Sequence, residues 1–123
     1  MHQQFILSMS CELKQRSLDV INELRKQNLL CDVTLLVNNM EIPAHKVVLA
    51  ALSPYFCAMF IESQQDRIIL QGVDPHALKL LIEYMYTSTL EINKENVVEL
   101  LTAANLLQLT DVRDACCDYL RTQ

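Results

Sequence analysis

The spacing of apolar residues along the chain predicts several short helices and a few β-strands. Between Cys11 and about Lys26, apolar side chains recur at helical spacing, which predicts an amphipathic helix of about four turns. The apolar positions fall into two sets, one made of Leu13, Val20, Ile21 and Leu24 and the other of Cys11 and Leu18. Such a helix usually touches two surfaces, its own core and a second subunit, although one broad core face is an equal alternative.

A β-hairpin is predicted after this helix. Residues 31–37 are rich in β-branched side chains, Asn38 and Asn39 supply a turn, and strand character resumes at 40–42 until Pro43. The next segment, His45–Leu52, is mostly apolar and predicts a short helix that must be buried.

Small polar residues mark the starts of the remaining helices, because their side chains accept hydrogen bonds from the free N–H groups of a first helical turn. We predict caps at Ser53, Asp74, Asn93 and Thr110, which open helices over 54–60, 75–85 and 97–106 and a last helix that follows Thr110 and reaches Leu120. Residues 61–66 are expected to form a loop, and 67–70 a short strand that ends at Gly72. The result is an α+β fold, mainly helical, with a small three-stranded sheet packed among helices.

Composition narrows the class of protein. The chain has 123 residues, of which 51% are hydrophobic, so it can build one ordinary core, and with 1 glycine and 3 prolines it contains no linker. Apolar runs such as Val47–Leu52 are far shorter than the roughly 20 residues that span a bilayer, and residues 1–9 lack the basic flank of a signal peptide. The formal charge is −5 with no basic stripe, which disfavours nucleic-acid binding. We expect a single soluble domain over residues 1–123, without a membrane partner.

No catalytic, cofactor or metal site is predicted. The three histidines, His2, His45 and His76, lie far apart, and none has metal-ligand spacing to a cysteine. A single glycine cannot build a phosphate-binding loop. A cysteine nucleophile paired with His45 is conceivable, but Cys57 lies on an apolar helix, where a buried inert thiol is commoner. We therefore expect that the chain is not an enzyme.

The cysteines indicate a reducing environment. There are 5 of them, an odd number, and they are scattered along the chain, which favours free thiols in a cytosolic or nuclear setting. A thiol-based sensor of electrophiles is one hypothesis that these residues leave open.

Large apolar residues gather on one short segment. Phe56, Met59, Phe60 and Ile61 exceed what one core face readily hides, and Glu62 follows them directly. Apolar anchors beside a charge are typical of the centre and rim of a protein interface. The alternative is a tightly buried helix in a small domain.

Several stretches resemble the core signature of BTB/POZ domains. They are Leu-Cys-Asp-Val-Thr-Leu at 30–35, Pro-Ala-His-Lys-Val-Val-Leu-Ala-Ala at 43–51 and Ser-Pro-Tyr-Phe-Cys-Ala-Met-Phe at 53–60. Residues 84–87, 95–97, 106–109 and 116–117 match in order and spacing, so the resemblance covers about 13–121. The endings Leu-Leu-Gln-Leu at 106–109 and Cys-Cys-Asp-Tyr-Leu at 116–120 are most similar to the Kelch-like branch.

The resemblance implies a homodimer that recruits partners. Proteins of the Kelch-like branch join this domain to a BACK domain and a Kelch propeller and act as substrate adaptors for a cullin-3 ubiquitin ligase. Dimerisation is implied for the helix at residues 11–27 and for part of the segment after Ala44. Asp32 and Lys46 correspond to a charged pair that forms a partly buried ionic pocket near the dimer interface. The implied interface residues are Leu13, Ser17, Leu18, Ile21, Asp32 and Lys46.

Cullin-3 contacts are implied for two places. They are the segment with Ala58, Met59, Phe60 and Glu62, and the loop that begins near Tyr86. Here the chain departs from its relatives, which usually have several more residues between the Ala-Met-Phe and Glu-Ser elements. In this sequence, Ile61 alone separates Phe60 from Glu62.

A different branch of the family gives an alternative function. The BTB domains of zinc-finger transcriptional repressors bind corepressor peptides in the dimer groove. In this alternative the N-terminal extension, residues 1–10, supplies a swapped edge strand from Gln4–Met9, which pairs by strand addition.

Overall fold

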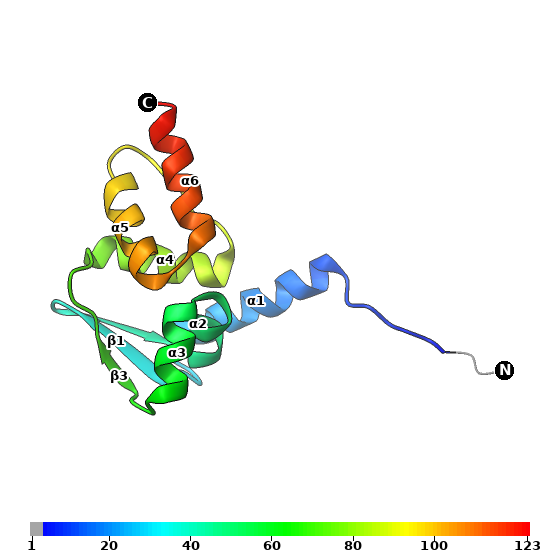
Figure 1. The fold of residues 1–123 in the computed structure, drawn as a ribbon. Helices are drawn as coiled ribbons and strands as arrows, with labels where there is room; N and C mark the ends of the chain where they lie inside the picture. Colours follow the sequence, from blue (N-terminus) through cyan, green and yellow to red (C-terminus); the bar gives the residue numbers. More distant parts are fainter. Residues whose placement is uncertain (1–3) are drawn as a thin grey trace.

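The computed structural model describes residues 4–123, so His2 lies outside the described residues. The described elements are α1 (Cys11–Lys26), β1 (Val33–Val37), β2 (Met40–Ala44), α2 (Lys46–Leu52), α3 (Pro54–Glu62), β3 (Arg67–Ile69), α4 (Pro75–Thr87), α5 (Val97–Leu107) and α6 (Thr110–Arg121). The predicted α+β fold with a small three-stranded sheet is confirmed (Figure 1).

The sheet has the strand order β2-β1-β3. β1 and β2 form the predicted antiparallel hairpin, with Val37 opposite Met40, whereas β3 pairs in parallel with β1. The hairpin differs from the prediction at Pro43, which lies inside β2 and does not end it. Proline is tolerated there because β2 is an edge strand, whose outer N–H groups need no partner strand.

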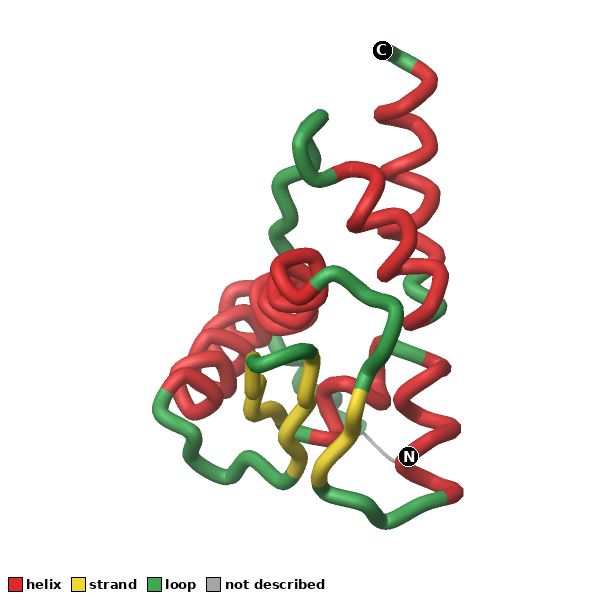
Figure 2. The backbone as a smooth tube through the Cα atoms, turned by 90° about the vertical axis from the view of Figure 1, so that its left-hand side faces the viewer, coloured by secondary structure: helices red, strands yellow, loops and turns green. Residues whose placement is uncertain are grey.

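Helix α4 lies at the centre of the domain. Its side chains Leu78, Leu81, Ile82 and Met85 are all buried, as the periodicity predicts. Figure 1 and Figure 2 show α4 between the α5–α6 pair and the layer formed by the sheet, α2 and α3. In this position α4 contacts α1, α2 and α5.

Two of the four predicted helix caps are confirmed. Ser53 accepts a hydrogen bond from the N–H of Phe56, and Asp74 accepts one from Ala77 at 3.0 Å. Both residues precede a proline at the start of the helix, the pattern that marks such helices in a sequence.

The other two predicted caps are wrong. Asn93 accepts hydrogen bonds of 3.0 Å from the N–H groups of Glu95 and Asn96, so it closes a turn before α5 and does not cap the helix. Thr110 is the first residue of α6, and the capping position is Leu109, which has no side-chain acceptor. In both cases the polar residue lies near the helix start but not at the capping backbone position.

The two short helices also differ from expectation. α2 is not buried as a whole, since Leu49 alone is buried in it and Val47 is 75% exposed. α3 continues through Ile61 to Glu62, where a loop was predicted, and the N–H of Ser63 donates to the carbonyl of Met59 at 2.9 Å. The segment after Met59 is therefore one continuous helical turn.

Within residues 4–123, no helix is both long enough and apolar enough to cross a bilayer.

Candidate interaction surfaces

Helix α1 meets the rest of the domain through its C-terminal half. All residues from Cys11 to Ser17 are exposed, and Figure 1 shows this half of α1 pointing away from the body of the domain. The protected side chains include Leu18, Ile21, Asn22 and Arg25, spaced on one side of the helix, which packs on α4.

The side of α1 that faces the domain is partly polar. Asn22 is the buried residue of the helix, and its Oδ1 accepts hydrogen bonds from Nε and Nη2 of Arg25 at 3.1 and 2.9 Å. By contrast, Leu13 is 43% exposed and Val20 is 59% exposed. The predicted stripe is therefore divided, because Leu13 and Val20 are exposed whereas Ile21 packs against the core and Leu24 is half-buried.

An apolar cavity of about 330 Å³ lies beside α1, between α1, α2 and α4. Its lining residues are Leu18, Val47, Val48, Ala51, Leu52, Met85 and Ser88. Val47 and Leu52 are also exposed, which extends the apolar surface across α2. We call the exposed side chains Val47 and Leu52, together with this cavity, the α1–α2 face. Of the implied dimer residues, Leu18 belongs to it, whereas Leu13 lies on another side of α1.

The expected ionic pocket between Asp32 and Lys46 is not formed within this chain. Asp32 is exposed, and its Oδ1 accepts a hydrogen bond from the backbone N–H of Lys46 at 2.7 Å. The Lys46 ammonium group lies instead over the ring of Phe60, 5.7 Å from its centroid. Among residues 4–123, no ion pair joins Asp32 to Lys46. The carboxylate thus fixes the start of α2 through the backbone.

Tyr86 is not on the surface. Its side chain is completely buried, and its hydroxyl accepts a hydrogen bond from the backbone N–H of His45 at 2.9 Å and lies 2.8 Å from Nδ1 of the same residue. His45 Nε2 lies 3.0 Å from the carbonyl oxygen of Leu29. A carbonyl oxygen only accepts, so Nε2 carries the proton and Nδ1 accepts from the Tyr86 hydroxyl. The Tyr86 side chain therefore offers no exposed surface, and the implied contact of the loop that begins near it stays a prediction.

The environment of Cys31 excludes a cysteine–histidine catalytic pair. Its Sγ lies 3.7 Å from His45 Nε2, but that nitrogen already carries a proton and cannot take another from the thiol. Burial raises the pKa of the Cys31 thiol, an effect that Arg25 opposes and Asp32 reinforces. All five cysteines are free. The cysteine therefore stays a thiol at neutral pH and is a poor nucleophile.

A groove of about 410 Å³ runs along α3. Its lining residues are Pro54, Tyr55, Ala58, Met59, Glu62, Ser63 and Gln108. Residues 55, 58, 59 and 62 recur at helical spacing and therefore share one side of α3. This feature, which we call the α3 groove, brings together three of the implied cullin-3 contacts, Ala58, Met59 and Glu62.

Phe60, the fourth residue of that predicted set on α3, does not line the groove. Its ring stacks on Phe56 with centroids 5.6 Å apart, and the Lys46 ammonium group lies over it. Phe60 therefore packs between Phe56 and Lys46, outside the groove, while Ile61 is exposed.

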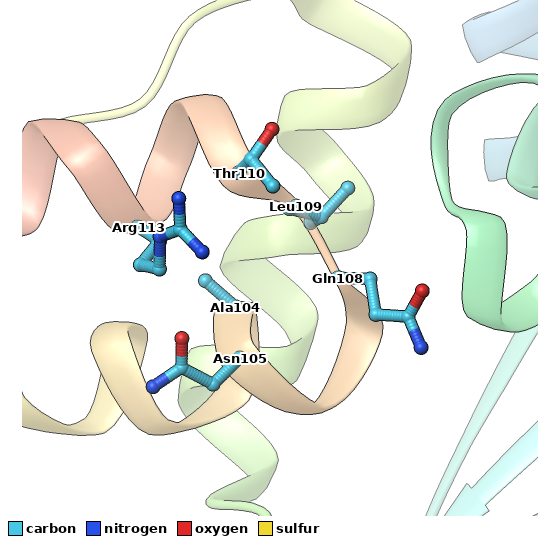
Figure 3. A pocket seen from close by; sticks show the side chains of 6 residues that line it. All are labelled: Ala104, Asn105, Gln108, Leu109, Thr110 and Arg113. Carbon is cyan, nitrogen blue, oxygen red and sulfur yellow. The ribbon is translucent and has the colours of Figure 1, made fainter.

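Gln108 forms the opposite wall of the α3 groove. It lies in the turn between α5 and α6 and has a left-handed backbone with φ of 59°. Figure 3 shows its side chain pointing away from Arg113, on the far side of a smaller hollow of about 190 Å³ that Asn105, Thr110 and Arg113 also line. The sequence stretch 106–109 contains this residue, but its place opposite α3 follows from packing and has no signal in the sequence.

Metal binding has no candidate site in the part of the chain that the structure describes. Within residues 4–123, no three His, Cys, Asp or Glu side chains cluster closely enough to hold an ion.

Comparison with known proteins identifies relatives over almost the whole chain. Residues 21–123 match the family model described as BTB/POZ domain. Kelch-like protein 2 of Rattus norvegicus is 52% identical over 113 residues, which is 89% of this chain and 19% of that protein. Kelch-like protein 3 of Homo sapiens is 52% identical over 112 residues, 88% of this chain and 19% of that protein. The chain thus spans about a fifth of the length of these relatives.

Solved structures agree with the fold. The BTB domain of zebrafish PATZ1 superposes with a TM-score of 0.89 at 28% identity and covers 97% of this chain and 100% of that chain. The BTB domain of human gigaxonin has a TM-score of 0.82 at 26% identity, over 96% of this chain and 99% of that chain.

Proposed function

The chain belongs to the BTB/POZ domain family, and from that premise we propose that it is a homodimeric adaptor that recruits a cullin-3 ubiquitin ligase through the α3 groove. It is a protein-interaction domain of the Kelch-like branch. In the full-length protein, a separate domain presents the substrate.

The exposed apolar side chains of α1 are the observation that supports the dimer. One copy of the chain leaves Leu13 and Val20 exposed on α1 while it buries Asn22. Apolar surface that is removed from water stabilises an assembly by about 25 cal/mol per Å². A second copy related by two-fold symmetry covers the stripe with its own α1, because such an interface uses the same patch on both chains.

Ser17 suits the centre of that interface. It shares the stripe with Leu13 and Val20, and its small side chain lets two helices approach closely. Its hydroxyl donates to the carbonyl of Leu13 at 3.1 Å, so burial by a partner leaves no unpaired donor.

The α3 groove has the chemistry of a helix-binding or peptide-binding site. Tyr55, Ala58 and Met59 supply an apolar floor, and Glu62 and Gln108 stand at its edges. In such interfaces the buried apolar anchors supply most of the affinity, and the rim charge fixes orientation. Met59 is thus the expected anchor, and Glu62 gives orientation and specificity.

The continuous helix supports this assignment despite the short segment after Phe60. Met59 and Glu62 are three residues apart within α3, so both side chains lie on the same face of the helix. This chain lacks the extra residues that Kelch-like relatives have after Phe60, but Met59 and Glu62 still lie next to each other on α3.

The recruitment proposal is tested by calorimetric titration with the N-terminal fragment of cullin-3. Ala58→Arg places a long cation in the groove at an exposed position and should weaken binding by about a hundredfold. Ala115→Arg is the matched control, since Ala115 is an exposed helical alanine on α6. We expect it to bind like wild type. Equal affinity of the Ala58→Arg variant and wild type would rule out this groove.

The exposed N-terminal segment favours a second candidate function, which is the binding of corepressor peptides beside the dimer. Residues 4–10 are extended and outside any helix or strand, and Phe5, Ile6 and Leu7 are exposed on them. Such a segment offers a strand for exchange between copies. The domain composition of the full-length protein discriminates the two functions, because the adaptor requires BACK and Kelch domains and the repressor requires zinc fingers.

A further inference from the structure

Ser53 joins the start of α3 to the end of α5 through hydrogen bonds. Its side chain is completely buried. Its hydroxyl accepts a hydrogen bond from the N–H of Phe56 at 3.2 Å and donates one to the carbonyl oxygen of Leu107 at 2.7 Å. Within residues 4–123, this is the hydrogen bond that joins the N-terminus of α3 to α5.

The Phe56 N–H and the Leu107 carbonyl, which Ser53 binds, lie close in the chain to residues that line the α3 groove. Tyr55 and Ala58 follow Ser53 by two and five residues on one wall, and Gln108 follows Leu107 by one residue on the other. Leu107 is the last residue of α5, after which the left-handed backbone of Gln108 turns its side chain toward the groove. The width of the groove at this end therefore depends on the bond between Ser53 and Leu107.

We propose that Ser53 is a positioning residue for the α3 groove: its hydroxyl sets the distance between Gln108 and the α3 side chains Tyr55 and Ala58. This inference rests on the proposed function of the groove. Because Ser53 is completely buried, it acts through Gln108 and α3 and not by direct contact with a partner. Loss of the hydroxyl leaves the Leu107 carbonyl without its buried donor, and the end of α5 shifts to find another.

A comparison of Ser53→Ala with Asp74→Ala separates positioning from general loss of stability. Asp74 caps α4 as Ser53 caps α3, with a proline next and an accepted N–H three residues later, but it is not bonded to α5. Both variants are measured at a temperature where circular dichroism shows them folded. We expect backbone hydrogen exchange at Gln108 and Leu109 to become about tenfold faster in Ser53→Ala and to stay unchanged in Asp74→Ala.

Binding gives the second readout. The affinity for the cullin-3 N-terminal fragment should fall about tenfold in Ser53→Ala and remain unchanged in Asp74→Ala. In the background of Gln108→Ala, the Ser53→Ala change should have a smaller further effect than in the wild type, since only its action through α3 remains. If the losses of affinity in Ser53→Ala and Gln108→Ala add up in the double variant, the positioning role is overturned.

Ser53→Cys, which is similar in size and a weak donor, should give a smaller effect in the same direction if Ser53→Ala does not fold.

The two readouts separate this inference from the proposed function. If the wild-type domain does not bind the fragment, recruitment through the groove fails, while the exchange rates still test Ser53. If Gln108 and Leu109 exchange equally fast in Ser53→Ala and Asp74→Ala, the positioning role is wrong even when the wild type binds.

Discussion

The hydroxyl of Tyr86 lies 2.8 Å from Nδ1 of His45, and this contact joins the last turn of α4 to the residue that precedes α2. The Arg25 guanidinium group of α1 lies over the same tyrosine ring, 4.9 Å from its centroid, and His45 Nε2 donates to Leu29 in the connection after α1. Tyr86 therefore holds α1, α2 and α4 together from inside the domain.

Removal of this hydroxyl should destabilise the fold. Tyr86→Phe keeps the ring but leaves the His45 N–H and Nδ1 without their partner in a buried site. We expect the free energy of unfolding to fall by about 1–3 kcal/mol in urea titrations. Tyr119→Phe is the matched control, because the Tyr119 hydroxyl makes no hydrogen bond with another residue in the range 4–123. Equal stability of the two variants would contradict the role of the Tyr86–His45 contact.

Alkaline pH should weaken the fold through the same residue. Burial raises the pKa of Tyr86 from 10.0 to about 12, so the tyrosine of the unfolded chain ionises at lower pH than that of the folded chain. Ionisation then favours the unfolded state. The contribution of Tyr86 to stability is therefore complete below about pH 10 and is lost as pH rises from about 10 toward about 12.

Urea unfolding at several pH values checks this dependence. The pKa of Tyr84 is also raised to about 12, by its hydrogen bond to Asp111, but Tyr84 is present in both wild type and Tyr86→Phe. The difference between the two proteins thus isolates Tyr86. We expect the wild type to lose stability more steeply than Tyr86→Phe above about pH 10. Parallel curves would show that Tyr86 ionises alike in both states.

A charge on the exposed stripe of α1 should abolish dimers without unfolding the chain. Val20→Glu adds a good helix former at a position that is 59% exposed in one copy. In a dimer it would bury a carboxylate without a partner, so the dissociation constant should rise about a hundredfold. Val98→Glu on α5, where the valine is 61% exposed, is the control and should leave the dimer intact. Sedimentation velocity measures both, and a Val20→Glu protein that still dimerises like wild type would exclude this stripe as the interface.

The cysteines should react in the order of their exposure. Cys11 is exposed, whereas Cys116 is buried and its pKa is raised by that burial and by the neighbouring Cys117. Mass spectrometry after brief alkylation at neutral pH should find Cys11 labelled first and at the rate of the urea-unfolded chain, and Cys116 labelled last. Labelling of Cys31 or any other cysteine faster than in the unfolded chain would indicate an activated thiol and support the sensor hypothesis.

Local signals in the sequence were sufficient for most of the fold. The serine or aspartate followed by proline at 53–54 and 74–75 predicts two helix starts, and the spacing of Leu78, Leu81 and Ile82 predicts the buried side of α4. The errors at Asn93 and Thr110 arise because composition near a helix start does not fix which residue has the capping backbone. The prediction that α2 is buried is wrong for a different reason. Apolar residues such as Val47 are equally suited to a core and to an interface, so their presence does not show which of the two they form.

The candidate site could be predicted only in part. The resemblance and helical spacing identify Ala58, Met59 and Glu62, because they belong to one local segment. Gln108 reaches the same groove through the packing of α5 against α3, a contact between residues about 50 positions apart that no local pattern encodes. The resemblance implies a contact at the loop that begins near Tyr86, but a motif position does not tell whether the tyrosine itself is buried, since its side chain suits a buried hydrogen bond as well as an exposed contact.

Homodimerisation and cullin-3 binding are tested together by light scattering coupled to size-exclusion chromatography, with and without the N-terminal fragment of cullin-3. Alone, the chain should have twice its mass of 14.1 kDa, and the complex should contain one fragment per chain, since each copy carries one α3 groove. A mass of 14.1 kDa that does not change when the fragment is added would contradict both the dimer and the recruitment.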